Sequence, residues 1–167
     1  MSHSVVGKGC SHLIIKARMV QTAEDLRLEG NAAFAQKKWK LAVKKYQASI
    51  NIDGKSQSSA KVYSNLCAAL CKLNKYDDAY EAAEKCTQVD PSWAKGFWRL
   101  GVTQELQKDF VSALASYTKA VEIEPEESTF INAVSYIFLP MFLLLDIEFI
   151  YHAPYPYLIS LYFVHLL

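Results

Sequence analysis

Two stretches of equal length decide the fold. Residues 60–93 read AKVYSNLCAALCKLNKYDDAYEAAEKCTQVDPSW, and residues 94–127 read AKGFWRLGVTQELQKDFVSALASYTKAVEIEPEE. Placed one above the other, they pair Cys67 with Gly101, Tyr76 with Phe110, Ala79 with Ala113, Ala83 with Tyr117 and Pro91 with Pro125. Every pair is 34 residues apart. A fixed period of this length indicates a repeat protein, in which each unit is one supersecondary structure.

A third copy of the unit precedes these two. Gly30, Trp39, Ala42 and Tyr46 stand 37 residues before the matching positions of the next unit. The period is therefore 34 with one insertion of three residues, and the GKSQSS segment at 54–59 is the natural place for it. We expect three repeats, at 23–56, 60–93 and 94–127, which together form one domain over 23–127.

Each repeat is predicted to form two helices. The first helices are expected at 23–36, 60–73 and 94–107, and the second at 39–52, 76–89 and 110–123. Stop and start residues lie between them: Asp53-Gly54, Asp90-Pro91-Ser92 and Glu124-Pro125. Small residues recur where paired helices must approach closely, and aromatic residues recur where the gaps need filling. No alternating pattern of strand type appears, so the fold class is all-α.

This pattern resembles the tetratricopeptide repeat family, in which a small residue, Ala, an aromatic residue and Pro recur at fixed offsets. The departures are Gly54 in place of the Pro of the first repeat and Cys67 in place of the Gly of the second. The resemblance implies a right-handed superhelix of helix pairs whose concave groove is lined by the first helix of each pair.

Five polar residues of the first helices are the candidate binding site: Arg27, Asn31, Asn65, Lys95 and Arg99. Arg27 and Asn31 lie one turn apart, as do Lys95 and Arg99. The Lys95 and Arg99 charges repel each other unless an anion lies between them. Amide and cationic donors that converge from three helices suit carboxylates, such as those of a peptide that ends in a free Asp.

The five residues resemble the two-carboxylate clamp of co-chaperone tetratricopeptide domains. The local strings are RLEGN at 27–31, YSN at 63–65 and WAKGFWR at 93–99. In that family the clamp holds the Glu-Glu-Val-Asp terminus of cytosolic seventy- and ninety-kilodalton heat-shock proteins, so the resemblance implies these C-terminal acidic peptides as partners. Arg27 replaces the usual Lys, which keeps the charge and changes its geometry.

Other interpretations of the same residues stay open. Lys and Arg occur by chance on such surfaces, and members of the family bind other partners. Asn31 and Asn65 can instead serve as hydrogen-bonding residues between helices. The lysines at 37, 38, 40, 44 and 45 are interpreted as a solvated surface, because residues 1–127 carry only +3 and we expect no nucleic-acid partner.

Catalysis and cofactors are not expected. The chain has no Gly-rich phosphate loop, no nucleophile elbow and no His-Glu metal motif. Its four cysteines at irregular spacing indicate neither a disulfide framework nor a zinc site, so a reducing, cytoplasmic location is predicted.

The two ends differ in composition from the repeats. Residues 1–22 are expected to be a disordered leader, and Met19 is an alternative start to Met1. Residues 128–167 contain no Lys or Arg. We expect a capping helix to begin near 126–133 and its pattern to fail after Ala133.

Three interpretations of residues 128–167 stay open. One is a membrane anchor, although the uncharged stretch 128–145 has 18 residues and no basic flank. A second is a cap over the open end of the superhelix, which the Pro spacing and the lack of a 3.6-residue period oppose. The third is an intron read in frame, because Val134-Ser135 can be encoded by a splice-donor string.

The sequence thus predicts a non-enzymatic adaptor that binds chaperone termini. The alternatives are a tail-anchored receptor with the same clamp, or a module of a larger enzyme such as a phosphatase or prolyl isomerase.

Overall fold

A computed structural model of the chain describes residues 21–144 and the side chains of residues 21–138. The helices are α2 (Ala23–Ala35), α3 (Trp39–Ile52), α4 (Ala60–Lys72), α5 (Tyr76–Val89), α6 (Ala94–Leu106), α7 (Phe110–Ile123) and α8 (Ser128–Leu144), with a short 3-10 helix η1 (Gln57–Ser59). The all-α repeat prediction is confirmed. The first helix of each pair ends one residue earlier than expected, and the second helices match.

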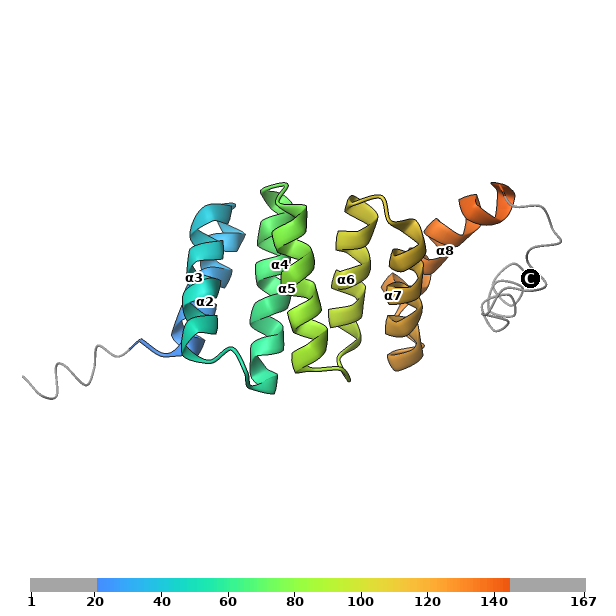
Figure 1. The fold of residues 1–167 in the computed structure, drawn as a ribbon. Coiled ribbons are helices and arrows are strands. Elements are labelled where there is room, and N and C mark those ends of the chain that lie inside the picture. The colour runs from blue at the N-terminus through green and yellow to red at the C-terminus, as the bar shows by residue number, and fades with distance from the viewer. Residues whose placement is uncertain (1–20, 145–167) are drawn as a thin grey trace, which may run out of the picture.

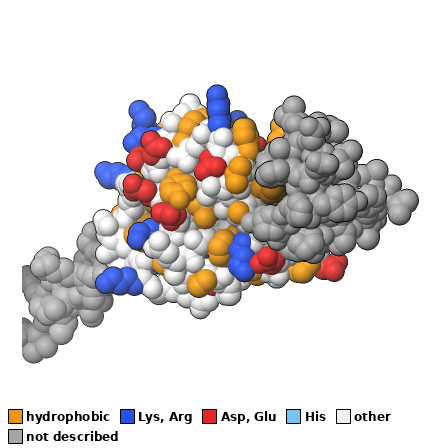
Figure 2. Space-filling model, turned by 45° about the vertical axis from the view of Figure 1, so that its right-hand side comes forward, with side chains coloured by type: hydrophobic (Ala, Val, Ile, Leu, Met, Phe, Trp, Pro, Cys, Tyr) orange, Lys and Arg blue, Asp and Glu red, His pale blue; other side chains and the backbone are white. Residues whose placement is uncertain are grey.

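The helices stand side by side in chain order, so that each packs mainly on its neighbours in sequence (Figure 1). The insertion lies where it was expected, because η1 and the preceding bend join α3 to α4. On the face drawn in Figure 2, acidic and basic side chains are interspersed with hydrophobic ones. No single sign of charge dominates that face.

The turn inside each pair has one conformation in all three repeats. Lys37, Asn74 and Lys108 adopt the left-handed region, with φ of 58°, 57° and 66°. The next amide in each case, such as that of Lys38, donates to the carbonyl five residues earlier, at 2.9–3.0 Å. This is the bond that closes a helix of the Schellman type and lets the chain reverse within three residues.

Close packing within a pair depends on a glycine that faces a tyrosine. A Cβ added at Gly30 would lie 2.5 Å from the ring of Tyr46, and one added at Gly101 would lie 2.6 Å from the ring of Tyr117. Both tyrosines are 1% exposed. In the second repeat the matching positions are Cys67 and Ala83, both fully buried.

Two groups of buried side chains form the core. The first joins α2, α3, α4 and α5 around Ala42, Tyr46 and Leu70, and Leu100 of α6 packs against it. The second joins α6, α7 and α8 around Tyr117 and Val121. The two groups of buried side chains thus lie at the two ends of the row of helices, and α6 contacts both groups.

Helix α8 corrects one expectation from the sequence. The helix does not fail after Ala133 but continues to Leu144, through Pro140. Phe130, Val134 and Ile137 are buried in the second core, at spacings of four and three that define one helical face. The pattern was missed because the flanking residues are also apolar. Residues 21–144 contain no helix with the length and apolarity needed to cross a membrane, and 145–167 lie outside the described residues.

Candidate functional site

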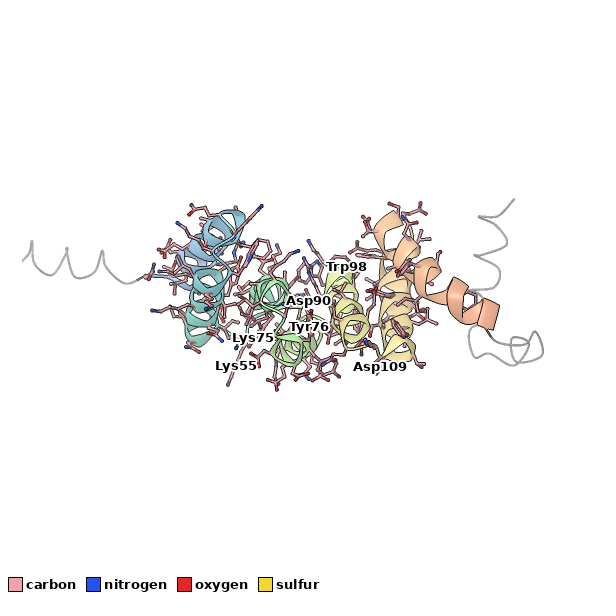
Figure 3. All side chains as sticks on the ribbon, turned by 90° about the horizontal axis from the view of Figure 1, so that it is seen from above. Lys55, Lys75, Tyr76, Asp90, Trp98 and Asp109 are labelled. Carbon is pink, nitrogen blue, oxygen red and sulfur yellow. The ribbon has the colours of Figure 1, made fainter. Side chains whose placement is uncertain are left out.

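Three adjoining pockets run across α2, α4 and α6, the first helices of the three pairs. Their volumes are ≈ 300, 330 and 580 Å³, and Arg99 lines all three. Lys75 and Asp109, which begin the second helices of their pairs, lie on the opposite side of the row from Trp98 (Figure 3). The three pockets share Arg99 and adjoin one another around it, and together they are called the groove.

Asn31 and Asn65 meet in the ≈ 300 Å³ pocket, together with Arg99. The Asn31 Oδ1 accepts a hydrogen bond from the Asn65 Nδ2 at 2.9 Å and another from the Tyr46 hydroxyl at 2.8 Å. The two donors fix the orientation of the Asn31 amide. Its Nδ2 has no hydrogen-bond partner among the described residues and remains a free donor beside the pocket. The two asparagines therefore form a hydrogen bond between helices, and the Asn31 Nδ2 is still available to a ligand.

Arg99 is held by its neighbour and lacks a counter-ion within residues 21–138. Its Cζ lies 4.6 Å from the centre of the Trp98 ring, in a cation–π contact. Its Nε is buried and has no hydrogen-bond partner in the described part of the chain. A buried donor without a partner costs free energy, so this guanidinium favours an anionic ligand in the groove.

Lys95 lies one turn before Arg99 and is exposed. It lines the ≈ 330 Å³ pocket with Trp93 and Trp98, at the junction with the start of α8. Glu124 and Glu127 line the same pocket. The two cations of α6 thus line the same pocket, as their one-turn spacing predicts.

Arg27 differs from the other four predicted residues. Its Nε donates to the Glu24 carboxylate at 2.7 Å, a hydrogen bond that lowers the pKa of Glu24 and raises that of Arg27. It does not line any of the three pockets described above. Its charge still acts on Tyr46, whose pKa is raised by burial and lowered in part by Arg27. Arg27 therefore lies at the edge of the site, paired with an exposed carboxylate that contributes little to hold it there.

Several lining residues were not predicted as parts of the site. Tyr46 positions Asn31, and Phe34 and Ala68 form the wall shared by the ≈ 300 and ≈ 580 Å³ pockets. Cys67 and Cys71 line the largest pocket. Cys67 and Cys71 lie one turn apart on α4, a first helix, and this i, i+4 spacing is a signal that could have placed them on one face.

The groove presents donors of the kind that pair with carboxylates. It combines two cations with amide donors and a partly apolar wall. Within residues 21–144, no group of three His, Cys, Asp or Glu side chains is arranged to hold a metal ion.

Comparison with known proteins agrees with this description. No family model matches the chain. The chain is 37% identical over 107 residues to the small glutamine-rich tetratricopeptide repeat-containing protein 2 of Saccharomyces cerevisiae, covering 64% of this chain and 30% of that protein. It is 32% identical over 112 residues to the Hsp70-Hsp90 organizing protein 3 of Arabidopsis thaliana, covering 67% and 20%.

A similar solved structure is the TPR2B domain of yeast Sti1 in complex with an Hsp70 peptide. Its TM-score is 0.64 at 28% identity, with 71% of this chain and 97% of that chain covered. The chain spans less than a third of either curated relative named above. Fold and sequence together place the described helices among the tetratricopeptide-repeat domains.

Proposed function

We propose that this chain is an adaptor that binds the C-terminal acidic peptide of cytosolic Hsp70 and Hsp90 chaperones. The observation that carries the proposal is the convergence of Asn31, Asn65 and Arg99 on one pocket. These side chains come from three helices and present donors without a carboxylate partner among the described residues. A free C-terminus ending in Asp offers two carboxylates a few ångströms apart, which this arrangement can hold together.

Each residue of the site has a separate role in the proposal. Asn31 and Asn65 bind the terminal carboxylate through their amides, and Arg99 supplies the central charge. Lys95 binds the neighbouring carboxylate from the adjoining pocket. Arg27 contributes after it exchanges Glu24 for the peptide, so its effect should be smaller.

The comparisons support the choice of ligand. The Arabidopsis relative is named for organizing Hsp70 and Hsp90, and the yeast Sti1 domain was solved with an Hsp70 peptide. This chain has amide and cationic donors on the face where such a peptide would lie. The proposal includes a cytoplasmic location, where the partners are, and a role without catalysis.

The experiment is titration calorimetry of the full chain with a Glu-Glu-Val-Asp peptide, as the free acid and as the C-terminal amide. The free acid should bind with a dissociation constant on the order of micromolar, because ordering a flexible peptide offsets part of the contact energy. Binding should weaken as salt rises, since it rests on partly exposed charge. Equal binding of acid and amide would refute the proposal.

Single-residue variants distinguish binding in the groove from a general effect of positive charge. Lys95→Ala and Arg99→Ala should each weaken binding at least tenfold, which corresponds to the loss of about 1.4 kcal/mol. Lys85→Ala is the matched control, because Lys85 is an exposed lysine on α5, a second helix. Helicity by circular dichroism should be the same in all three. A control that loses as much affinity as the groove variants would show that the charge acts without the site.

A further inference from the structure

The largest pocket of the groove contains two cysteines. Cys67 and Cys71 of α4 line the ≈ 580 Å³ pocket together with Lys72 and Arg99. The rest of its wall is mainly apolar: Phe34, Ala68, Tyr76, Val102 and Leu106. Cys67 is fully buried, whereas Cys71 is partly exposed. Both are free thiols.

The two thiols are chemically unequal. The neighbouring Cys67 thiol lowers the pKa of Cys71, and the Cys71 side chain together with burial raises the pKa of Cys67. Burial opposes the change at Cys71, and the charges of Arg99 and Lys72 reinforce it. Because the thiolate is the nucleophile, Cys71 is the more reactive of the pair and also the more accessible.

Cys86 provides an internal contrast. It is fully buried, lies on α5, and its thiol donates to the Ala60 carbonyl at 3.2 Å. Burial raises its pKa to about 12. Of the three cysteines that the structure describes, Cys71 alone combines partial exposure in the pocket with a lowered pKa.

Arg99 gives an independent reason to expect an anionic ligand in this pocket. It lines the pocket with Lys72, and its buried Nε has no partner in the described residues. A small disulfide that carries carboxylates would therefore be drawn toward the Cys71 sulfur by two cations. Glutathione disulfide has this chemistry.

We propose that Cys71 is a modification site for small acidic disulfides, and that the adduct closes the groove to the peptide. The Cys71 thiolate attacks one sulfur of glutathione disulfide, whose sulfur–sulfur bond breaks. A mixed disulfide forms on Cys71, which is oxidised, and the other glutathione leaves reduced, as a thiolate that takes up the proton lost by Cys71. Free thiol reverses the reaction by the same exchange.

The second part of this proposal rests on the proposed function. Cys71 and Arg99 line the same pocket, and Arg99 also lines the pocket of Asn31 and Asn65. An adduct on Cys71 would occupy the groove next to Arg99, and its carboxylates would compete for that guanidinium. Oxidation would then release the peptide, and reduction would restore binding.

The test uses the full chain with Cys10→Ser in every variant, so that the remaining thiols are the three described above. Glutathione disulfide is added, and intact mass with peptide mapping measures the adduct. We expect one glutathione per chain, on Cys71, formed about tenfold faster or more than on Cys86. Cys71→Ala should remove the fast adduct, whereas Cys86→Ala should leave it unchanged. Arg99→Gln should slow its formation.

Peptide binding is measured on the same samples before oxidation, after oxidation and after dithiothreitol. The proposal expects binding to be lost and then regained, and expects Cys71→Ala to bind before and after oxidant alike. Fast modification of Cys67 or Cys86 in place of Cys71 would overturn the site, as would a Cys71 that reacts only after denaturation. An adduct on Cys71 that leaves the affinity unchanged would overturn the switch and spare the clamp. A reduced chain that binds no peptide would refute the proposed function, while the mass data would still decide the site.

Discussion

The first and third repeats differ from the second at the point where their paired helices touch. In the outer repeats a glycine faces a tyrosine, Gly30 with Tyr46 and Gly101 with Tyr117, and no side chain larger than hydrogen fits. In the second repeat Cys67 and Ala83 fill the same space, and both are fully buried. The contact between paired helices can therefore be filled by a glycine and a tyrosine or by two small side chains, so the identity of these residues is free to change.

The difference between the repeats also changes which side-chain groups lie near the groove. The Tyr46 hydroxyl donates to Asn31 at 2.8 Å, and the Tyr117 hydroxyl donates to the Glu105 carboxylate at 2.8 Å. Ala83 has no such hydroxyl, and the second repeat instead presents the Cys67 thiol to the largest pocket. Tyr46 thus positions a groove residue, Tyr117 bonds to a glutamate outside the three pockets, and the middle repeat presents sulfur.

The sharpest way to break this comparison is to give the second repeat a tyrosine without its glycine. Ala83→Tyr would force a ring against Cys67, which is already fully buried, and should lower the free energy of unfolding by about 3 kcal/mol or more. Urea unfolding measures the loss. Adding Cys67→Gly should recover part of it, because the pair then matches the outer repeats. If Ala83→Tyr is as stable as the parent, the filling of this contact does not explain the difference.

The converse change removes a glycine from an outer repeat. Gly101→Ala should cost about 1–2 kcal/mol, because the clash of the new Cβ with Tyr117 exceeds the gain in helix propensity. Gly96→Ala on the same helix is the control, because a Cβ added at Gly96 would have as its nearest neighbour the Cys86 Sγ, at 3.2 Å. Thermal unfolding should rank Gly96→Ala above Gly101→Ala. The reverse order would contradict the close-packing argument.

A smaller change separates the two outer repeats from each other. Tyr46→Phe removes the donor that orients Asn31 and should cost about 1 kcal/mol of stability. It should also weaken peptide binding severalfold. Tyr117→Phe removes the donor to Glu105 at a similar cost in stability, and the affinity should stay unchanged. Equal affinities for both variants in calorimetry would count against a positioning role for Tyr46.

The smallest expected effect concerns how the second helices begin. Asp109 accepts a hydrogen bond from the Ser112 amide at 3.1 Å, whereas Lys38 and Lys75 at the matching places make no side-chain cap. Hydrogen bonding to Ser112 holds the pKa of Asp109 below its ordinary value of 3.8. The cap therefore stabilises the fold above that value and is lost as pH falls through the folded pKa. Asp109→Ala should unfold at a slightly lower temperature at neutral pH, and the two proteins should converge in strong acid. A difference that grows on acidification would contradict this sign.

Much of the architecture follows from the 34-residue period, because small and aromatic residues recur where helix pairs must touch. The period also places Asn31, Asn65 and Arg99 on the first helices. Hydrogen bonding between helices was one of the interpretations that the sequence left open for Asn31 and Asn65, and the structure joins the two at 2.9 Å. The i, i+3 spacing of Glu24 and Arg27 permits the ion pair that the structure shows, and the same spacing leaves Arg27 equally able to bind a ligand.

Helix α8 escaped prediction for another physical reason. An amphipathic period is visible only against polar residues, and the residues around Phe130, Val134 and Ile137 are largely apolar. Helix α8 also runs through Pro140, although a proline removes one backbone donor and usually ends or kinks a helix.

The left-handed residues at Lys37, Asn74 and Lys108 have a consequence for how this domain can evolve. A side chain in that region costs about 1 kcal/mol, less for Asn, and glycine avoids it. Lys37 and Lys108 line none of the three pockets, so glycine at these two positions would leave ligand contacts untouched, whereas Asn74 lines the ≈ 580 Å³ pocket. A domain near the usual margin of 5–15 kcal/mol would gain a sizeable reserve from them. That reserve could absorb destabilising changes in the groove, and with them a shift to new partners.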